Sequence, residues 1–169
     1  VPWRGITDAD VLTAMRTVPR HEFVPPELRH LAYEDQPLPI GHGQTISQPF
    51  IVAYMTQAIA PRRADRILEV GTGSGFQSAY LSNLTDRVWT IEIIKPLADR
   101  TRGLSAKLIE KGYTEYQHIK SKAADGYYGW EEAAPFDKII VTCGIDHVQP
   151  PLLQQLKAGG LMVIPVGPP

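Results

Sequence analysis

The sequence has a single cysteine and no accumulation of charge of either sign. Its 169 residues include 17 Lys or Arg and 18 Asp or Glu, for a formal net charge of -1. No stretch contains a cluster of Lys and Arg of the kind that binds the phosphate backbone of nucleic acids, so nucleic acid is not expected as a partner. Cys143 has no second cysteine for an internal disulfide, and its position after the apolar Val141 predicts a buried thiol in a reducing cytoplasm.

Long apolar segments are missing as well. No run approaches the roughly 20 residues that a membrane-spanning helix needs. The first residues, 1–4, lack the charged start and apolar middle of a signal peptide. We therefore expect a soluble, cytoplasmic protein that does not contact a membrane. The chain has no starting Met and stops directly after a predicted strand, so we expect both ends to be trimmed.

The length and composition fit one domain. With 43% apolar and 8% aromatic residues, 169 residues suffice for one compact core and not for two. We divide this domain, residues 1–169, into an N-terminal helical segment with a long loop (1–60) and a core of alternating strands and helices (61–169). The balanced composition shows no apolar stripe for a partner, so a monomer is expected.

The first part of the chain combines helices with an irregular stretch. Asp8 is the predicted cap of a first helix. Residues 34–49 have no hydrophobic periodicity and are punctuated by proline and glycine, which predicts a long ordered loop with Gly41 and Gly43 as hinges. A helix is then predicted from Pro49 until Pro61.

Beyond residue 61, strand and helix patterns alternate. Strands are predicted at 66–70, 88–91, 117–119, 138–141 and 161–166, and helices at 76–84, 96–111 and 151–156. This alternation predicts right-handed crossovers and an α/β fold with a doubly wound, mainly parallel sheet that has helices on both faces. Ligands of such sheets bind where the carboxyl ends of the strands open.

The glycine-rich segment after the first of these strands carries the strongest functional signal. It reads Glu69-Val70-Gly71-Thr72-Gly73-Ser74-Gly75 and precedes a predicted helix. Glycines there allow a sharp turn and a close approach of the backbone to a ligand. A dinucleotide fingerprint has its third glycine at the sixth position, whereas here Phe76 stands at that position and the third glycine comes one residue early. The spacing therefore argues against NAD.

Acidic residues follow the next two predicted strands. Glu92 lies at a strand's carboxyl end, about 20 residues beyond the glycine segment, where a carboxylate can accept protons from both ribose hydroxyl groups. The alternative is a solvated carboxylate at a strand end. We place the next residue, Ile93, in the same site. Asp125-Gly126 follows the third predicted strand, and it is a simple turn when taken alone. In this order the three landmarks predict a nucleoside pocket.

Several segments carry a family resemblance. They are Val18 to Pro25, Gly43 to Pro49, Glu69 to Gly75, and Leu156 to Gly167. Over nearly the whole chain they resemble the bacterial type of protein-L-isoaspartate O-methyltransferase, a family of class I S-adenosylmethionine-dependent methyltransferases. Thr45-Ile46-Ser47-Gln48-Pro49 separates that family from methyltransferases in general.

The resemblance implies both a reaction and a site. It implies transfer of the S-adenosylmethionine methyl group to the free carboxylate of L-isoaspartyl residues in damaged proteins and peptides, with S-adenosylhomocysteine as product. Gly71 to Gly75 would receive the amino acid end of the cofactor, Glu92 the ribose, and Asp125-Gly126 the adenine. Ser47 would be the active-site serine, and the neighbouring Thr45, Ile46 and Gln48 would line the same cleft.

The chain departs from the family pattern at two places. Ala124 stands where family members have glycine, and members continue past Pro165-Val166-Gly167 with further strands, so C-terminal strands are expected to be missing here. Two alternatives stay open. One is a cofactor-binding adaptor that recognises damaged chains without methylating them, and the other is a carboxyl methyltransferase for one dedicated peptide. None of the five histidines has a metal-ligand spacing, so no metal is expected.

Overall fold

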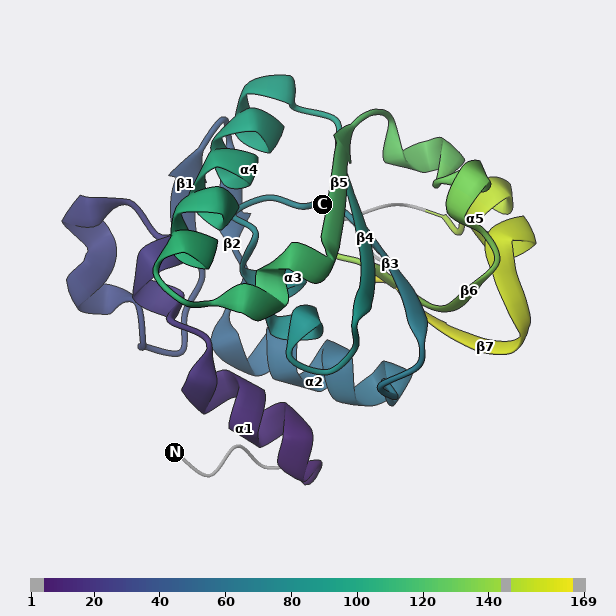
Figure 1. Cartoon of the computed structure of the whole chain (residues 1–169), viewed down its shortest axis with the longest axis horizontal. Helices are drawn as coiled ribbons and strands as arrows, with labels where there is room; N and C mark the ends of the chain where they lie inside the picture. Colours follow the sequence, from purple (N-terminus) through teal and green to yellow (C-terminus); the bar gives the residue numbers. More distant parts are fainter. Residues whose placement is uncertain (1–4, 144–146, 166–169) are drawn as a thin grey trace.

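A five-stranded parallel sheet forms the centre of the computed structural model, which describes residues 5–143 and 147–165 (Figure 1). Its strands are β3 (Arg66–Val70), β4 (Arg87–Glu92), β5 (Ile119–Ala123), β6 (Phe136–Val141) and β7 (Leu156–Val163). The order across the sheet is β5-β4-β3-β6-β7. The chain therefore runs outward from β3 through β4 to β5, returns to the centre at β6, and continues outward in the opposite direction. This reversal between β3 and β6 is a topological switch point.

Helices cover both faces of the sheet, as predicted. They are α1 (Ala9–Thr17), α2 (Pro49–Ile59), α3 (Phe76–Ser82), α4 (Lys95–Glu110) and α5 (Pro150–Gln155). Successive residues of β3 point to opposite faces. Ile67 packs in one apolar cluster with Ile59 of α2 and Leu81 of α3. Leu68 packs in another cluster with Leu152 of α5. The predicted fold class, a doubly wound α/β sheet, is confirmed.

Short 3-10 helices complete the connections. They are η1 (Arg20–Phe23), η2 (Pro26–Leu31), η3 (Thr114–His118), η4 (Gly126–Tyr128) and η5 (Glu131–Ala133). Asp8 caps α1, because its side chain accepts hydrogen bonds from the backbone N–H groups of Asp10 and Val11. The N-terminal segment thus contains the predicted first helix, and α2 begins at Pro49 as predicted.

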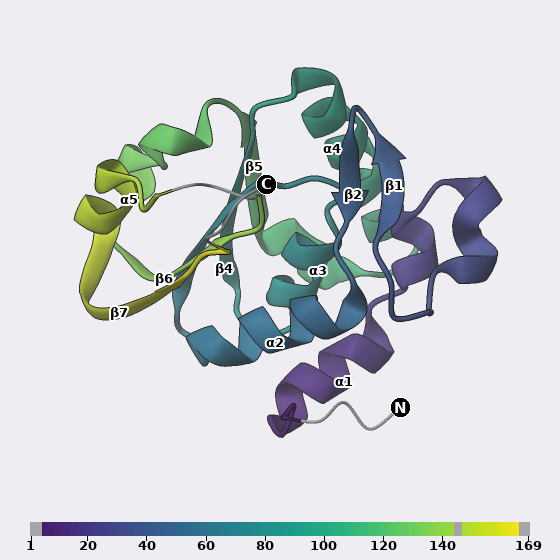
Figure 2. The same cartoon turned by 180° about the vertical axis from the view of Figure 1, so that it is seen from behind.

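The prediction of an irregular loop over residues 34–49 is wrong. The segment contains an antiparallel hairpin of β1 (Leu38–Gly41) and β2 (Gln44–Ile46). Gly41 and Gly43 have φ angles of +87° and +69° and occupy its turn. The strands have four and three residues, which is too short for a visible alternation. Arg100 of α4 donates to the carbonyl oxygen of Ile40, and the hairpin lies beside α4 in both views (Figure 2).

Two strand boundaries also differ from the prediction. Residues 114–118 form η3, so β5 begins only at Ile119. The last strand was expected at 161–166, but β7 begins at Leu156 and includes the glycines that were expected to end a helix. At Gly160 a Cβ atom would lie 2.7 Å from the carbonyl oxygen of Asp137, so the close approach of the chain to β6 requires glycine there. The predicted end of that strand, Val166, lies outside the described residues.

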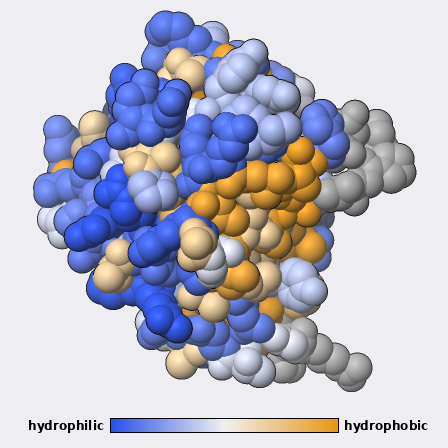
Figure 3. Space-filling model, turned by 90° about the vertical axis from the view of Figure 1, so that its right-hand side faces the viewer, coloured by the Kyte–Doolittle hydropathy of each residue, from blue (hydrophilic) through white to orange (hydrophobic). Residues whose placement is uncertain are grey.

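The edge strand β7 and the neighbouring α5 carry exposed apolar side chains. Leu153 on α5 is 55% exposed and Leu161 on β7 is 43% exposed. Figure 3 shows this side of the molecule, where a continuous apolar area interrupts the polar surface. Within the described ranges, no helix combines the length and the apolar character that crossing a membrane requires.

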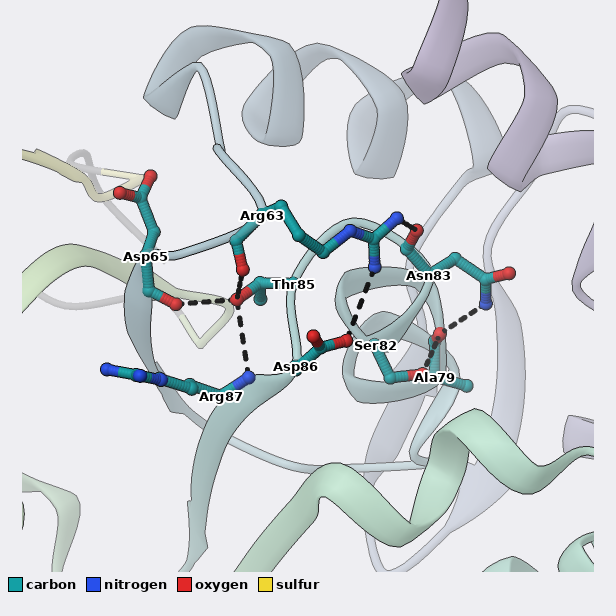
Figure 4. A network of polar contacts seen from close by, with 8 residues as sticks. All are labelled: Arg63, Asp65, Ala79, Ser82, Asn83, Thr85, Asp86 and Arg87. Carbon is teal, nitrogen blue, oxygen red and sulfur yellow. Dashed lines mark hydrogen bonds and ion pairs between the residues drawn. The ribbon is translucent and has the colours of Figure 1, made fainter.

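A network of polar contacts holds the amino ends of β3 and β4, at the opposite end of these strands from the glycine segment (Figure 4). The hydroxyl group of Thr85 is buried and lies within hydrogen-bond distance of the carbonyl oxygens of Arg63 (3.1 Å) and Asp65 (2.6 Å). The same oxygen accepts from the backbone N–H of Arg87 at 3.3 Å. Thr85 therefore links the segment before β3 to the start of β4.

We predict that Thr85→Val lowers the free energy of unfolding by about 2 kcal/mol, because it leaves buried backbone groups without their partner while conserving shape. Chemical denaturation measures this change. Thr13→Val, at an exposed position of α1, is the matched control and should change stability by less than about 0.5 kcal/mol. Equal effects of the two substitutions would contradict the role given to Thr85.

Candidate cofactor site

A cavity of about 450 Å³ opens at the carboxyl ends of β3, β4 and β6, at the switch point of the sheet. It combines residues that are far apart in the sequence. Twelve of the predicted site residues line it, namely Thr45, Ile46, Ser47, Glu69, Gly71, Thr72, Gly73, Ser74, Glu92, Ile93, Asp125 and Gly126. The hairpin, the glycine segment and the segments after β4 and β5 therefore meet around one space.

Two predicted site residues do not line this cavity. The side chain of Gln48 instead donates to Asp35 Oδ2 at 3.0 Å. Gly75, the last residue of the glycine segment, is not part of the cavity lining, and a Cβ atom there would approach Thr101 Cγ2 to 2.6 Å. Its φ of +88° and this contact show that Gly75 shapes the turn into α3. Gln48 is also the residue directly before α2, so Gln48 and not Ser47 occupies the cap position of that helix.

The glycine segment makes a tight turn over the ends of β3 and β6. Gly71 has a φ of +100°, and a Cβ atom there would lie 2.8 Å from Thr142 Oγ1. Gly73 also has a positive φ, and its carbonyl oxygen accepts a hydrogen bond from Thr101 Oγ1 at 2.7 Å. The turn is therefore held by β6 on one side and α4 on the other, with its backbone facing the cavity.

Glu92 supports the same turn from β4. Its Oε1 accepts from the backbone N–H of Gly73 at 2.8 Å, and its Oε2 accepts from the backbone N–H of Ile94 at 3.0 Å. Each carboxylate oxygen has a second lone pair that these bonds leave available. Glu92 can therefore hold the glycine turn and still accept two hydrogen bonds from a diol in the cavity.

Glu69 lies deeper, with no exposed surface. Its Oε1 accepts from Thr90 Oγ1 at 2.7 Å and from Ser78 Oγ of α3. Its Oε2 is buried and has no hydrogen-bond partner within the described part of the chain. The pKa of Glu69 is raised to about 7, and burial is the largest cause. The hydrogen bonds from the Ser78 and Thr90 hydroxyl groups lower this pKa, and the nearby charge of Glu92 contributes to the increase. Near neutral pH this carboxyl group is divided between its two protonation states.

The charged side chains among the described residues that line the cavity are all acidic. Glu69, Glu92 and Asp125 contribute carboxyl groups to its lining, and no Lys, Arg or His is among the described residues that line it. A pocket of this kind disfavours phosphates and suits a cationic ligand. Among the described residues, no group of three or more His, Cys, Asp or Glu side chains is arranged to hold a metal ion.

Ser47 lies on the rim of the cavity and is positioned through its backbone. Its carbonyl oxygen accepts from Arg20 Nη2 at 2.9 Å, and Arg20 Nε donates to the carbonyl oxygen of Ala32 at 2.7 Å. Arg20 is almost fully buried, which lowers its pKa to about 10, and its guanidinium lies 4.8 Å from the centre of the Phe76 ring. Sequence reasoning did not identify this role, because nothing in the sequence indicates that this arginine is buried.

The prediction for Cys143 is wrong. We expected a buried thiol at the end of a strand, but β6 ends at Val141, and Cys143 is exposed and lines the cavity. Tyr127, which follows Gly126 in η4, is 37% exposed and also lines the cavity, although it was not among the predicted site residues. Cys143 lies two residues beyond the end of β6, and a sequence pattern places such a boundary only approximately.

The doubly wound sheet, with a glycine turn and a carboxylate-lined cavity at its switch point, defines a class I S-adenosylmethionine-dependent methyltransferase fold. Comparison with known proteins identifies the family. The family model described as protein-L-isoaspartate(D-aspartate) O-methyltransferase matches residues 3–169. The chain belongs to this family.

Individual relatives agree with this assignment. The chain is 58% identical to the protein-L-isoaspartate O-methyltransferase of Opitutus terrae over 98% of this chain and 68% of the relative. It is 53% identical to protein-L-isoaspartate O-methyltransferase 1 of Nitrosospira multiformis over 95% of this chain and 66% of that relative. The chain thus spans about two thirds of the length of these curated relatives.

A solved structure shows the same architecture. It is a crystal structure of a protein described as a possible protein-L-isoaspartate O-methyltransferase from Plasmodium falciparum, in complex with S-adenosyl-L-homocysteine. The TM-score is 0.81 at 25% identity, over 98% of this chain and 80% of that chain.

We predict that Glu69→Gln removes a pH-dependent loss of stability. The pKa of the folded carboxyl group is raised from 4.5 to about 7, so its contribution is fully present below pH 4.5 and is lost as the pH rises through 7. The stability of the variant relative to the unchanged protein should therefore increase by roughly 3 kcal/mol between pH 4.5 and pH 8. Urea denaturation at several pH values measures this difference. Glu110→Gln, at an exposed position of α4, should show no such trend, and a pH-independent difference for Glu69→Gln would contradict the account.

Proposed function

We propose that the cavity at the switch point binds S-adenosylmethionine, and that the protein transfers its methyl group to the free carboxylate of L-isoaspartyl residues in damaged proteins and peptides. One observation carries this proposal. In a member of this family, Ser47 lies on the rim of the same cavity that Glu92 and the glycine turn line. A substrate carboxylate held near Ser47 is therefore adjacent to the cofactor space.

The residues of the cavity fit this cofactor. The turn at Gly71 and Gly73 leaves room for the amino acid end, and the unpaired buried Oε2 of Glu69 suits a positively charged group. Glu92 can accept both ribose hydroxyl protons, and Asp125-Gly126, which also lines the cavity, would contact the adenine. When bound, the cofactor supplies a methyl group activated by its sulfonium charge.

Catalysis of this reaction depends mainly on the positioning of the two reactants. A substrate carboxyl group with a pKa near ~4 is already ionised at neutral pH, so no strong general base is needed. Ser47 would orient this carboxylate by hydrogen bonding. Arg20 would fix the backbone of Ser47 from the buried side. Holding two reactants in line in an enclosed site can contribute several kcal/mol.

We further propose how the chain is organised. Residues 1–60 supply the hairpin wall and Ser47, and residues 61–169 supply the cofactor-binding core of a single domain. A formal net charge of -1 supports a protein that does not bind nucleic acid, and a single cysteine fits a reducing compartment. We also propose that the protein is a monomer. Light scattering on the purified protein tests the oligomeric state, and a dimer at micromolar concentration would contradict this part of the proposal.

The central experiment uses labelled S-adenosylmethionine with paired peptides that differ only in an isoaspartyl or a normal aspartyl linkage. We predict label on the isoaspartyl peptide alone. Label on neither peptide despite cofactor binding would instead indicate an adaptor. A requirement for one particular peptide sequence would indicate a dedicated carboxyl methyltransferase. Family membership favours repair over both alternatives.

We predict that Ser47→Ala lowers turnover by about 100-fold, as expected when a group that orients the reactants is lost. The dissociation constant for S-adenosylhomocysteine should change less than threefold, because the proposed role of Ser47 is to orient the substrate carboxylate and not to bind the cofactor. Initial rates and calorimetry give the two values. Ser105→Ala, on α4 and outside this cavity, is the matched control. Full activity of Ser47→Ala would contradict the role of this hydroxyl group.

A further inference from the structure

The carboxyl group of Glu69 is paired at only one of its two oxygens. Its Oε1 accepts two hydroxyl hydrogen bonds, whereas its Oε2 has no partner within the described ranges. The side chain has no exposed surface, yet Glu69 forms part of the cavity lining. An unpaired oxygen of a buried carboxylate is costly, because neither water nor a donor compensates its charge.

The hydroxyl groups that contact Glu69 lie at one of its two carboxyl oxygens. Ser78 Oγ and Thr90 Oγ1 are within hydrogen-bond distance of Oε1, and Thr90 Oγ1 lies 2.6 Å from Thr72 Oγ1. A hydroxyl group can donate to an ionised carboxyl group or accept from a protonated one, so these contacts serve both protonation states of Glu69. Through Thr90 and Thr72, Glu69 is linked by hydrogen bonds to the glycine turn.

Among the described residues that line the cavity, no Lys, Arg or His brings a positive charge to Glu69. On β4 it faces Thr90 and the carboxylate of Glu92, and on α3 it faces the hydroxyl group of Ser78. After β6, the nearby ionisable group is Cys143, which is exposed at the cavity. The surrounding protein atoms still displace part of the water around its thiol, which raises its pKa, and the charges of Glu92 and Glu69 raise that pKa further. In the unliganded protein, protonation is therefore the available way to neutralise the buried oxygen.

We infer that the carboxyl group of Glu69 releases a proton when the amino acid end of the cofactor enters the cavity, so that cofactor binding is coupled to proton release. This inference rests on the proposed function. The ammonium group of the ligand takes the place of the proton as the positive charge beside the carboxyl group, and the proton leaves to solvent. Both the methyl donor and its demethylated product carry this ammonium group, so both bind with proton release.

The coupling makes affinity depend on pH in a defined direction. Below the pKa of about 7, ligand binding must displace a proton from Glu69, so affinity rises with pH by up to about tenfold per unit. Above that pKa the carboxylate is already ionised and the dependence levels off. A nucleoside without the amino acid end does not displace the proton, and its affinity stays constant over this range.

The test is isothermal calorimetry at pH 6.5 in buffers with different ionisation enthalpies, which counts the protons exchanged on binding. S-adenosylhomocysteine is the ligand, and 5′-methylthioadenosine, which lacks the amino acid end, is the matched control ligand. We expect release of roughly 0.8 proton with the first, the protonated fraction at pH 6.5 for a pKa of about 7, and none with the second. Equal release with both ligands, or no release with either, would overturn the inference.

Variants give a second, independent readout. Glu69→Gln keeps an oxygen that can accept from Thr90 and Ser78 but carries neither the proton nor the negative charge. S-adenosylhomocysteine should therefore bind this variant more weakly, without proton exchange and with an affinity that no longer rises with pH. Glu110→Gln should release the same number of protons as the unchanged protein. Release that persists in Glu69→Gln would assign the proton to another group and overturn the inference. Failure of S-adenosylhomocysteine to bind the unchanged protein would instead refute the proposed function.

Discussion

The site depends on the reversal of strand order between β3 and β6. Because β4 and β6 pair with opposite sides of β3, the segments after these strands diverge and leave a cavity at the carboxyl edge. The glycine turn follows β3 directly and is held by the carboxylate of Glu92 on the neighbouring strand. Other features of the site, from the hairpin rim to the buried Glu69, take their positions relative to this turn.

The cavity contains buried acidic groups. Three carboxyl groups line it without a cation from the described chain, and the deepest of them has an unpaired oxygen. Such an arrangement destabilises the empty protein and favours a ligand that brings positive charge. The N-terminal segment contributes differently, because buried Arg20 ties the hairpin side of the cavity to the rest of the molecule through backbone carbonyl groups.

Much of this arrangement was predictable from the sequence. The strand that ends at Val70, the glycine spacing and Glu92 indicated the sheet and the pocket, since each is a local pattern with a direct physical cause. The β1–β2 hairpin, the early start of β7 and the exposure of Cys143 were not predicted. They depend on short strands and on contacts such as that of Gly160 with β6, which only the folded chain reveals.

The central claim is that one cavity holds the whole methyl donor, with the glycine turn at one end and Asp125 at the other. A crystal structure of the protein with bound S-adenosylhomocysteine tests it most directly. The account predicts the amino acid end beside Gly71 and Glu69, and both ribose hydroxyl groups within hydrogen-bond distance of the Glu92 carboxylate. A nucleoside bound elsewhere, or a ribose that does not contact Glu92, would contradict it.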